Sequence, residues 1–423
     1  MIEIQEFVDG VVDETLSDDE VESWMRNVYD NGLSSEDTVT LTNAMLHSGV
    51  VLQWPQQWSE LVVDKHSTGG IGDKVSLPLA PALAACGLKC PMIAGRGLAH
   101  TGGTLDKLES LPGYDVSLSP EAAQNQVAEI GCMIAGQSGD FAPADKRMYA
   151  IRDVSGLITS TPLITGSILS KKAAGGLAAL IMDIKVGKAT FMRDEEMARQ
   201  LARSIVSTGE GLGIHTTVML SEMDTPLGFS AGNALEVLES VETLRGCGPG
   251  DLEELVCMQG GILLAATGQA DTPQLGAVMI LDSLHDGSAM TKFGQMCIAQ
   301  GVAPEVFASE HSLLLAIGLL SKTLQTTEFH APMSGHISDI DAHDLGTVVL
   351  ELGGGRLRLG DEIDHQVGFV LDAHVGSEVD EGEAWITIYH REPLSDEHAA
   401  AVQNSLTITE NPVTVKSRII SIL

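Results

Sequence analysis

The stretch Asp64-Lys-His-Ser-Thr-Gly-Gly-Ile-Gly-Asp73 is the strongest indication of the fold in this sequence. It follows the apolar run Leu61-Val-Val63, which predicts a short buried strand, and it precedes an Ala- and Leu-rich segment that predicts a helix to about Cys86. Glycines at 69, 70 and 72 let the backbone turn tightly and direct N–H groups at an anion in front of that helix. A strand, a Gly-rich loop and a helix in this order predict an α/β fold with an anion site at the loop.

A second Gly-rich loop, Gly95-Arg-Gly-Leu-Ala-His-Thr-Gly-Gly-Thr104, follows another strand-like run, Pro91–Ala94. Glycines alone make tight turns, but turns explain neither the nearby hydroxyls nor the local excess of Lys and Arg. Neither loop has the Walker A or the Gly-x-Gly-x-x-Gly pattern, so no nucleoside triphosphate or dinucleotide is implied. An ammonium and three hydroxyls form the donor set that phosphate prefers, and we expect it from Lys65, Ser67, Ser76 and Thr104.

The overall charge makes this local basic excess informative. The 423 residues include 24 Lys and Arg against 58 Asp and Glu, a formal net charge of −34. Such a surface repels nucleic-acid phosphates and anionic lipid, so we expect neither a nucleic-acid nor a membrane partner. An anionic substrate must then be bound by a local cluster of cations that works against the overall field.

Cysteine spacing and the N-terminal residues bear on metal content and location. The six cysteines show no zinc-like pattern, and Met1–Glu6 has neither a basic region nor an apolar signal core. We therefore expect reduced thiols, no metal site and a cytoplasmic protein.

A second group of polar residues lies in Tyr149-Ala-Ile-Arg-Asp153 and Ser167-Ile-Leu-Ser-Lys171. Ser167 and Lys171 are four residues apart, so on a helix they share one face. A Ser, a Lys and an Arg that point together suit a planar polar ligand whose carbonyl oxygens become negative as it leaves. Taken alone, such basic residues are more often solvated, so this group gains weight only beside the first.

Two further residues have two interpretations each. His66 stands between Lys65 and Ser67, where an imidazole is placed to donate to a departing group, although an isolated loop His is more often just exposed. Lys185 either faces the same site or is a surface charge at the end of a strand.

The rest of the chain divides into three regions with different sequence patterns. The N-terminal part is helical: Ser17 predicts the N-cap of a helix with Val21, Trp24, Met25 and Val28 on one apolar face, and a second helix runs from Ser35 to Gly49. Strand and helix patterns then alternate, which predicts a sheet covered by helices. They are Leu180–Val186, Glu195–Ser207 and Thr216–Ser221. After about residue 328 a third module begins, with β-like segments at Gly335–Ser338, Val348–Leu352 and Trp385–Tyr389.

The two Gly-rich loops, continued through Leu105-Asp-Lys-Leu-Glu109, resemble the signature of the thymidine and pyrimidine-nucleoside phosphorylase family. Pro162-Leu-Ile-Thr-Gly-Ser-Ile-Leu-Ser-Lys-Lys172 and Gly232–Glu236 support the resemblance, which runs from about residue 60 to the end. It implies an α/β fold in which a helical lobe packs across a cleft from a larger α/β lobe, with a C-terminal α+β module. The implied division is residues 1–60 with 144–175, residues 61–143 with 176–328, and residues 329–423.

The resemblance also implies roles for the site residues. Lys65, Ser67, Ser76 and Thr104 would hold phosphate, and the catalytic groups would be His66, Arg152 and Lys171. The implied reaction is reversible phosphorolysis of a pyrimidine (deoxy)nucleoside, with thymidine as the expected substrate, without any cofactor because phosphate is a co-substrate. A homodimer through the helical lobe is implied as well. The base would contact Tyr149, Arg152, Ser167 and Lys171, between apolar walls made by Leu98, Ile164, Ile168 and Phe191.

Four departures from the family pattern stand out. Ala94 replaces a phosphate-binding Ser, Ala99 replaces a Gly, and Lys188-Ala-Thr190 replaces three small residues before Phe191. Lys74 stands where some members bind potassium through a Thr, and we hypothesise that its ammonium replaces the ion. Two alternatives remain: a phosphorylase of a nucleoside monophosphate, for which no second phosphate site is visible, and a ligand-binding relative that has lost turnover.

Overall fold

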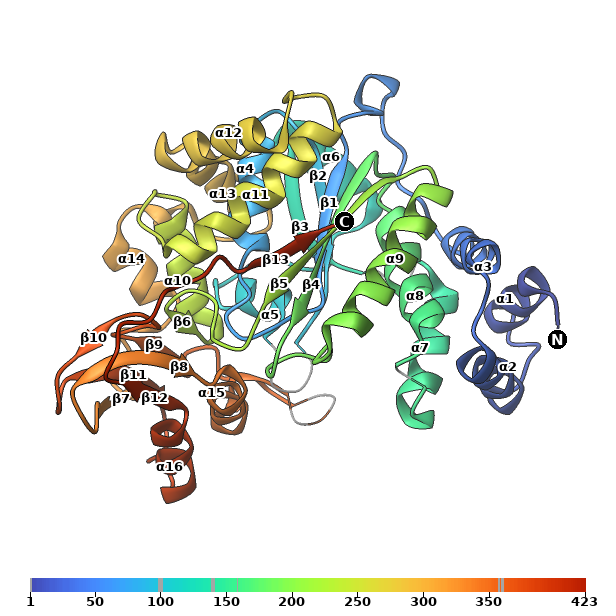
Figure 1. The fold of residues 1–423 in the computed structure, drawn as a ribbon. Helices are drawn as coiled ribbons and strands as arrows, with labels where there is room; N and C mark the ends of the chain where they lie inside the picture. Colours follow the sequence, from blue (N-terminus) through green and yellow to red (C-terminus); the bar gives the residue numbers. More distant parts are fainter. Residues whose placement is uncertain (1, 98–101, 138–140, 158, 357, 359–360) are drawn as a thin grey trace.

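The computed structural model describes residues 2–97, 102–137, 141–157, 159–356, 358 and 361–423. It has the expected mixed α/β architecture, with a helical lobe beside a larger α/β lobe and a C-terminal α+β module (Figure 1). In Figure 1 the N-terminal helices lie on one side of the central strands, and the C-terminal module lies on the other. The residue boundaries given above for the three parts stay a prediction.

The central sheet has the strand order β1-β4-β5-β13. The first three strands are parallel, with Lys65 opposite Ile181, and the last strand joins antiparallel to β5. A parallel bridge between Val62 and Lys89 brings the parallel pair β2-β3 alongside β1. The strands are β1 (Val63–Ser67), β2 (Cys90–Ala94), β3 (Cys132–Gly136), β4 (Ala179–Val186), β5 (His215–Glu222) and β13 (Ile419–Ile422).

One strand boundary differs from the sequence-based expectation, and the difference matters for the site. The strand was expected at Leu61–Val63, but β1 begins at Val63 and pairs with β4 over five residues. Lys65, His66 and Ser67 therefore lie on the strand and not in the loop that follows. Backbone pairing on β4 fixes these three side chains more tightly than a loop would.

Helices cover the faces of this sheet, and the alternation of strand and helix patterns between residues 180 and 221 is confirmed. The helix α4 (Ser76–Ala85) has nine buried residues, which explains why it is rich in Ala and Leu and lacks a polar face. The other helices are α5 (Thr104–Leu108), α6 (Pro120–Glu129), α9 (Glu195–Gly211), α10 (Asn233–Thr243), α11 (Gly250–Ala266), α12 (Pro273–His285), α13 (Ser288–Ala299) and α14 (Glu310–Ala316), with short 3-10 turns at Gln56–Trp58 and Pro304–Phe307.

The helical lobe has its own apolar core. Ser17 caps its second helix through a capping box with Glu20, and the four residues expected on the apolar face are buried. The ring of Phe7 stacks on Trp24, with centroids 3.9 Å apart. Helices α1 to α3 pack on α7 and α8, and the five are α1 (Ile4–Val12), α2 (Asp18–Asn31), α3 (Ser35–His47), α7 (Pro143–Ser155) and α8 (Thr161–Ala173).

The C-terminal module is built around two small sheets, of order β10-β8-β12 and β6-β9-β11-β7, and the second sheet includes the short strand β6 from residues 230–231. The prediction of a β segment at Val348–Leu352 is wrong: these residues end α15 and enter a π-helical turn, Leu350–Gly354. Leu345 and Val348 are buried three residues apart, the spacing of a helix, after an N-cap at Asp341. The elements are β6 (Ser230–Ala231), β7 (Gln325–His330), β8 (Gly335–Ile340), α15 (Ala342–Val349), β9 (Gly368–Leu371), β10 (Glu378–Val379), β11 (Ala384–His390), α16 (Asp396–Asn404) and β12 (Leu406–Thr409).

Candidate active site

The first cluster of the site lies where β1 runs into the Gly-rich loop. Lys65 and Ser67 come from β1, and Ser76 is the first residue of α4. The Lys65 Nζ donates to Ser76 Oγ at 3.3 Å and lies 3.7 Å from Asp73 Oδ1. Ser67 Oγ donates to Asp73 Oδ2 at 2.5 Å. The structure therefore brings three of the four predicted phosphate donors together: Lys65 and Ser67 contact Asp73, and Ser76 contacts Lys65.

Asp73 is the residue that the sequence-based reasoning missed. Burial favours its neutral form, but the ammoniums of Lys185, Lys65 and Lys107 hold the pKa of Asp73 far below its ordinary value. Lys107 Nζ also donates to the backbone carbonyl of Asp73 at 2.6 Å. The signal for Asp73 was available, because it closes the quoted Gly-rich stretch, but nothing in the sequence showed which lysines surround it.

Each lysine in this cluster already has a carboxylate partner. Lys185 is wholly buried and pairs with Asp183 at 2.7 Å, so it is not a surface charge at a strand end. Burial opposes its charge, yet Asp183 and Asp73 raise the pKa of Lys185. Lys107 pairs with Glu236 at 2.8 Å. The site thus pairs each of these buried lysines with an acid. Burial lowers the pKa of Lys65, and the charge of Asp73 opposes that shift.

The fourth predicted donor, Thr104, begins α5 directly after two glycines. Lys107 of the same helix contacts Asp73, which ties α5 to the Gly-rich loop. Arg96 is committed elsewhere: it pairs with Glu109 at 2.8 Å, and bonds to Glu109 and Asp106 raise its pKa. Its charge holds the start of the second Gly-rich loop and is not directed at the first cluster.

The second cluster lies on α7 and α8. Lys171 Nζ donates to Ser167 Oγ at 3.2 Å, which confirms that these two residues share a helix face. The same Nζ pairs with Asp145 at 2.8 Å and lies 6.0 Å from the centre of the Tyr149 ring. Arg152, one turn after Tyr149, is 3% exposed, and its Nη1 donates to the carbonyl of Leu163 at 3.0 Å. Burial lowers the pKa of Arg152, and the charges of Asp145 and Tyr149 oppose that shift.

His66 connects the two clusters electrostatically. Burial, together with the ammoniums of Lys172, Lys171 and Lys65, holds the pKa of His66 well below its ordinary value. Its imidazole is therefore neutral near pH 7 and offers one N–H donor. A direct contact joins the same two elements, since Lys172 Nζ of α8 donates to the backbone carbonyl of Lys65 on β1 at 2.9 Å.

Comparisons with known proteins identify the family. Residues 59–290 match the model described as glycosyl transferase family, a/b domain, and residues 336–409 match the pyrimidine nucleoside phosphorylase C-terminal domain. Over 411 residues the chain is 43% identical to thymidine phosphorylase of Mus musculus, covering 96% of this chain and 87% of that protein. The Rhizobium meliloti thymidine phosphorylase is 42% identical, covering 98% of this chain and 90% of the relative.

The chain belongs to the thymidine and pyrimidine-nucleoside phosphorylase family. It is therefore an enzyme of the pentosyltransferase class. A crystal structure of anthranilate phosphoribosyltransferase from Thermus thermophilus shares the fold, with a TM-score of 0.52 and 17% identity over 70% of this chain and 99% of that one.

The four apolar residues expected around the base have different surroundings in this pentosyltransferase. Ile164 and Ile168 are half-buried on α8, where both pack against an apolar core. Phe191 is 54% exposed. Leu98 lies outside the described residues, as does Ala99. Two of the expected walls therefore lie on the same helix as Ser167 and Lys171, and Phe191 follows β4.

Lys74, one residue beyond the Gly-rich loop, is completely buried. Its Nζ donates to the backbone carbonyls of Leu227 at 3.0 Å and Ser230 at 2.8 Å, and it pairs with the carboxylate of Glu239. Each of the three oxygens accepts from the ammonium, and carbonyl and carboxylate oxygens are also the ligand atoms that a hard cation takes. The contacts fit the hypothesis that this ammonium replaces an ion.

Within the described residues, no group of three or more His, Cys, Asp or Glu side chains is arranged to hold a metal. The helices of the described part of the chain are also too short or too polar to cross a membrane.

Proposed function

We propose that this chain catalyses the reversible phosphorolysis of a pyrimidine (deoxy)nucleoside, with thymidine preferred, giving the free base and (deoxy)ribose 1-phosphate. The relatives at 41–43% identity are thymidine phosphorylases, which supports this reaction and this substrate. The observation that carries the proposal is the position of His66. His66 lies on β1 between Lys65 and Ser67, and its side chain points to the opposite face of the strand because side chains alternate. Lys172 of α8 donates to the backbone carbonyl of Lys65 at 2.9 Å, which brings α8 against this strand. One residue thus stands between a cluster suited to phosphate and a cluster suited to a leaving base.

In this reaction Lys65, Ser67, Ser76 and Thr104 hold phosphate. The contacts of Lys65 with Ser76 and Asp73 hold its ammonium in place before phosphate binds. The Ser67 hydroxyl donates a hydrogen bond to Asp73 in the structure. When phosphate binds, this hydroxyl must rotate to donate to phosphate or accept a hydrogen bond from it. A preorganised ammonium of this kind costs little reorganisation at the moment of reaction.

The base binds at the second cluster, where Arg152, Lys171 and the neutral His66 face its carbonyl oxygens. A phosphate oxygen forms a bond to the anomeric carbon as the bond from that carbon to the base nitrogen breaks. The electron pair of the broken bond stays on the base, and the proton carried by hydrogen phosphate ends on that base. The remaining contacts to the base would come from Tyr149, Ser167, Leu98, Ile164, Ile168 and Phe191.

The test is release of free base from thymidine, deoxyuridine, uridine and cytidine, each with and without inorganic phosphate. We expect phosphate-dependent release, fastest from thymidine. Lys171→Ala should lower kcat by about 100-fold or more, as loss of one transition-state donor does. Lys292→Ala is the matched control, because Lys292 donates to the carbonyl of Ile130, outside both clusters. No release by a folded protein would refute the proposal, and binding without turnover would favour a non-catalytic relative.

Three further features belong to the proposal. The reaction needs no cofactor, because phosphate is the nucleophile and protein side chains meet each charge that develops. We propose a homodimer that buries part of the helical lobe, made from residues 1–60 and 144–175, and light scattering on the purified protein tests it. The six cysteines are all free thiols, which supports a cytoplasmic location.

A further inference from the structure

The segment from residue 222 to residue 230 supports the Gly-rich loop from behind. The amide of Leu227 donates to the carbonyl of Ile71 at 3.0 Å. A side chain at Gly72 would lie 2.5 Å from the carbonyl oxygen of Leu227, and one at Gly70 would lie 2.7 Å from Met223. The backbone of the segment and the Gly-rich loop therefore touch directly, and neither can shift without moving the other.

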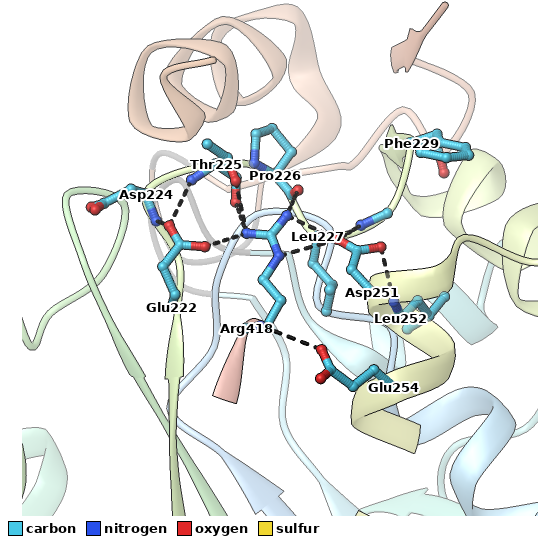
Figure 2. Close-up of polar contacts among 12 residues, drawn as sticks. Glu222, Asp224, Thr225, Pro226, Leu227, Phe229, Asp251, Leu252, Glu254 and Arg418 are labelled. Atoms are coloured by element: carbon cyan, nitrogen blue, oxygen red, sulfur yellow. Dashed lines mark hydrogen bonds and ion pairs between the residues drawn. The ribbon is translucent and has the colours of Figure 1, made fainter. Parts of the chain in front are cut away.

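Arg418 holds this segment from its other side (Figure 2). It precedes β13, so it reaches the segment from a strand nearly 200 residues away in sequence. Its Nη1 donates to Glu222 Oε2 at 2.6 Å and to the carbonyl and hydroxyl of Thr225 at 2.9 and 2.8 Å. Its Nη2 donates to the carbonyl of Pro226 at 2.5 Å and to Asp251 Oδ2 at 2.9 Å, and its Nε donates to the same oxygen at 3.1 Å. All three guanidinium nitrogens are used, and the side chain is 11% exposed.

The two carboxylates that Arg418 neutralises also bind the backbone of the segment. Glu222 accepts from the amides of Asp224 and Thr225, and Asp251 Oδ2 accepts from the amide of Gly228 at 3.2 Å. Without the guanidinium, these two half-buried carboxylates would lose the cation that lies between them (Figure 2). The arginine therefore sets both the position of the segment and the charge balance beneath it.

We propose that Arg418 is a positioning residue for phosphate binding: it fixes segment 222–230, which in turn fixes the Gly-rich loop and Lys74. The inference rests on the proposed function for the identity of the anion. The α7–α8 cluster is tied together by Lys171, Ser167 and Asp145, none of which Arg418 contacts. Loss of Arg418 should therefore weaken binding of phosphate and leave binding of the nucleoside largely unchanged.

The experiment compares Arg418→Ala and Arg418→Lys with Arg391→Ala. Arg391 is the matched control because it also binds a carboxylate and two neutral side chains, those of Asp364, Thr323 and Gln366, but none of them belongs to segment 222–230 or to the Gly-rich loop. Phosphate Kd is measured by titration calorimetry with inorganic phosphate, and KM is measured separately for phosphate and nucleoside.

We expect Arg418→Ala to raise the phosphate Kd and KM by about tenfold, as weakening of one charge-assisted hydrogen bond would, with nucleoside KM changed by less than about twofold. The phosphate Kd of Arg418→Lys should lie between those of the wild type and Arg418→Ala, because an ammonium cannot bind both carboxylates as the planar guanidinium does. Asp251→Asn, which keeps the shape of the pocket, serves if Arg418→Ala does not fold, and it should raise the phosphate Kd in the same sense.

An unchanged phosphate Kd in folded Arg418→Ala, or an equal rise in both KM values, would overturn the inference. So would the same rise in phosphate Kd for Arg391→Ala, since the effect would then be general loosening. A wild-type protein that binds phosphate but releases no base would refute the proposed reaction alone, because the comparison of phosphate Kd values would still stand.

Discussion

Replacing Lys74 by Met should destabilise the protein strongly, although Met has nearly the same length and apolar stem. The Nζ of Lys74 is fully buried and has three oxygen neighbours: the carbonyls of Leu227 and Ser230 and the carboxylate of Glu239. The substitution keeps the packing of the side chain and removes only its charge and its three hydrogen bonds.

The magnitude follows from what Glu239 retains. Removing one partner of a buried ion pair costs about 3–5 kcal/mol, because the other charge is left uncompensated. Glu239 still accepts from the amides of Phe229 at 2.8 Å and Ser230 at 3.4 Å. We therefore expect Lys74→Met to lower the free energy of unfolding by about 3 kcal/mol, the lower end of this range. The double variant Lys74→Met/Glu239→Gln buries no lone charge and should lose only about 1–2 kcal/mol.

Urea unfolding of the four proteins in this double-mutant cycle measures the free energies. Lys322→Met is the control, because Lys322 is exposed and its loss should change stability by about 0.5 kcal/mol or less. A loss below about 1 kcal/mol for Lys74→Met, or a double variant as unstable as the sum of the two singles, would refute the reasoning. Equal wild-type activity in potassium and tetramethylammonium salts is expected if the ammonium replaces an ion; dependence on potassium would contradict it.

Three more predictions concern other parts of the site and the fold. The pKa of His66 lies below its unfolded value, so its contribution to stability is present above about pH 6.5 and is lost as pH falls below that. Between pH 7.5 and 5.5 the melting temperature of His66→Asn should therefore fall less than that of the wild type, and parallel curves of melting temperature against pH would contradict this. Lys172→Met removes the partner of Asp64, 2.6 Å away, and should cost about 3–5 kcal/mol in urea unfolding, whereas a loss below about 1 kcal/mol would show that the pair is not held. Ser17→Ala breaks the capping box with Glu20 and should cost about 1 kcal/mol without changing activity, and unaltered stability would count against the cap.

Local sequence patterns predicted much of the fold. The capping box and the 3.6-residue spacing of buried residues gave α2 correctly, because both signals act within one or two turns of helix. The alternating strands and helices between residues 180 and 221 were equally clear. The prediction of a β segment at Val348–Leu352 was wrong because a short apolar run has the same composition in a buried helix as in a strand. The packing of α15 decided between the two.

The candidate site was likewise predictable from the sequence only in part. Residue types showed that the two loops offer an ammonium and hydroxyls, and that Ser167 and Lys171 share a face, because four-residue spacing is a property of the helix itself. They did not show that Asp73 lies at the centre of the first cluster. Lys74 looked like one more positive charge beside the loop, yet its ammonium is bound by Glu239.

The sequence by itself determined several of the helices and strands, the family and the kinds of group at the site. Tertiary structure alone decided which charges meet: Lys172 pairs with a residue 108 positions away, Lys74 with one 165 away, and Arg418 with one 196 away. The physical reason is that the energy of a buried charge depends on distances of a few ångströms and on exclusion of water. Neither quantity is encoded by neighbours in the chain, so only the folded arrangement of β1, α8, α10 and β13 fixes them.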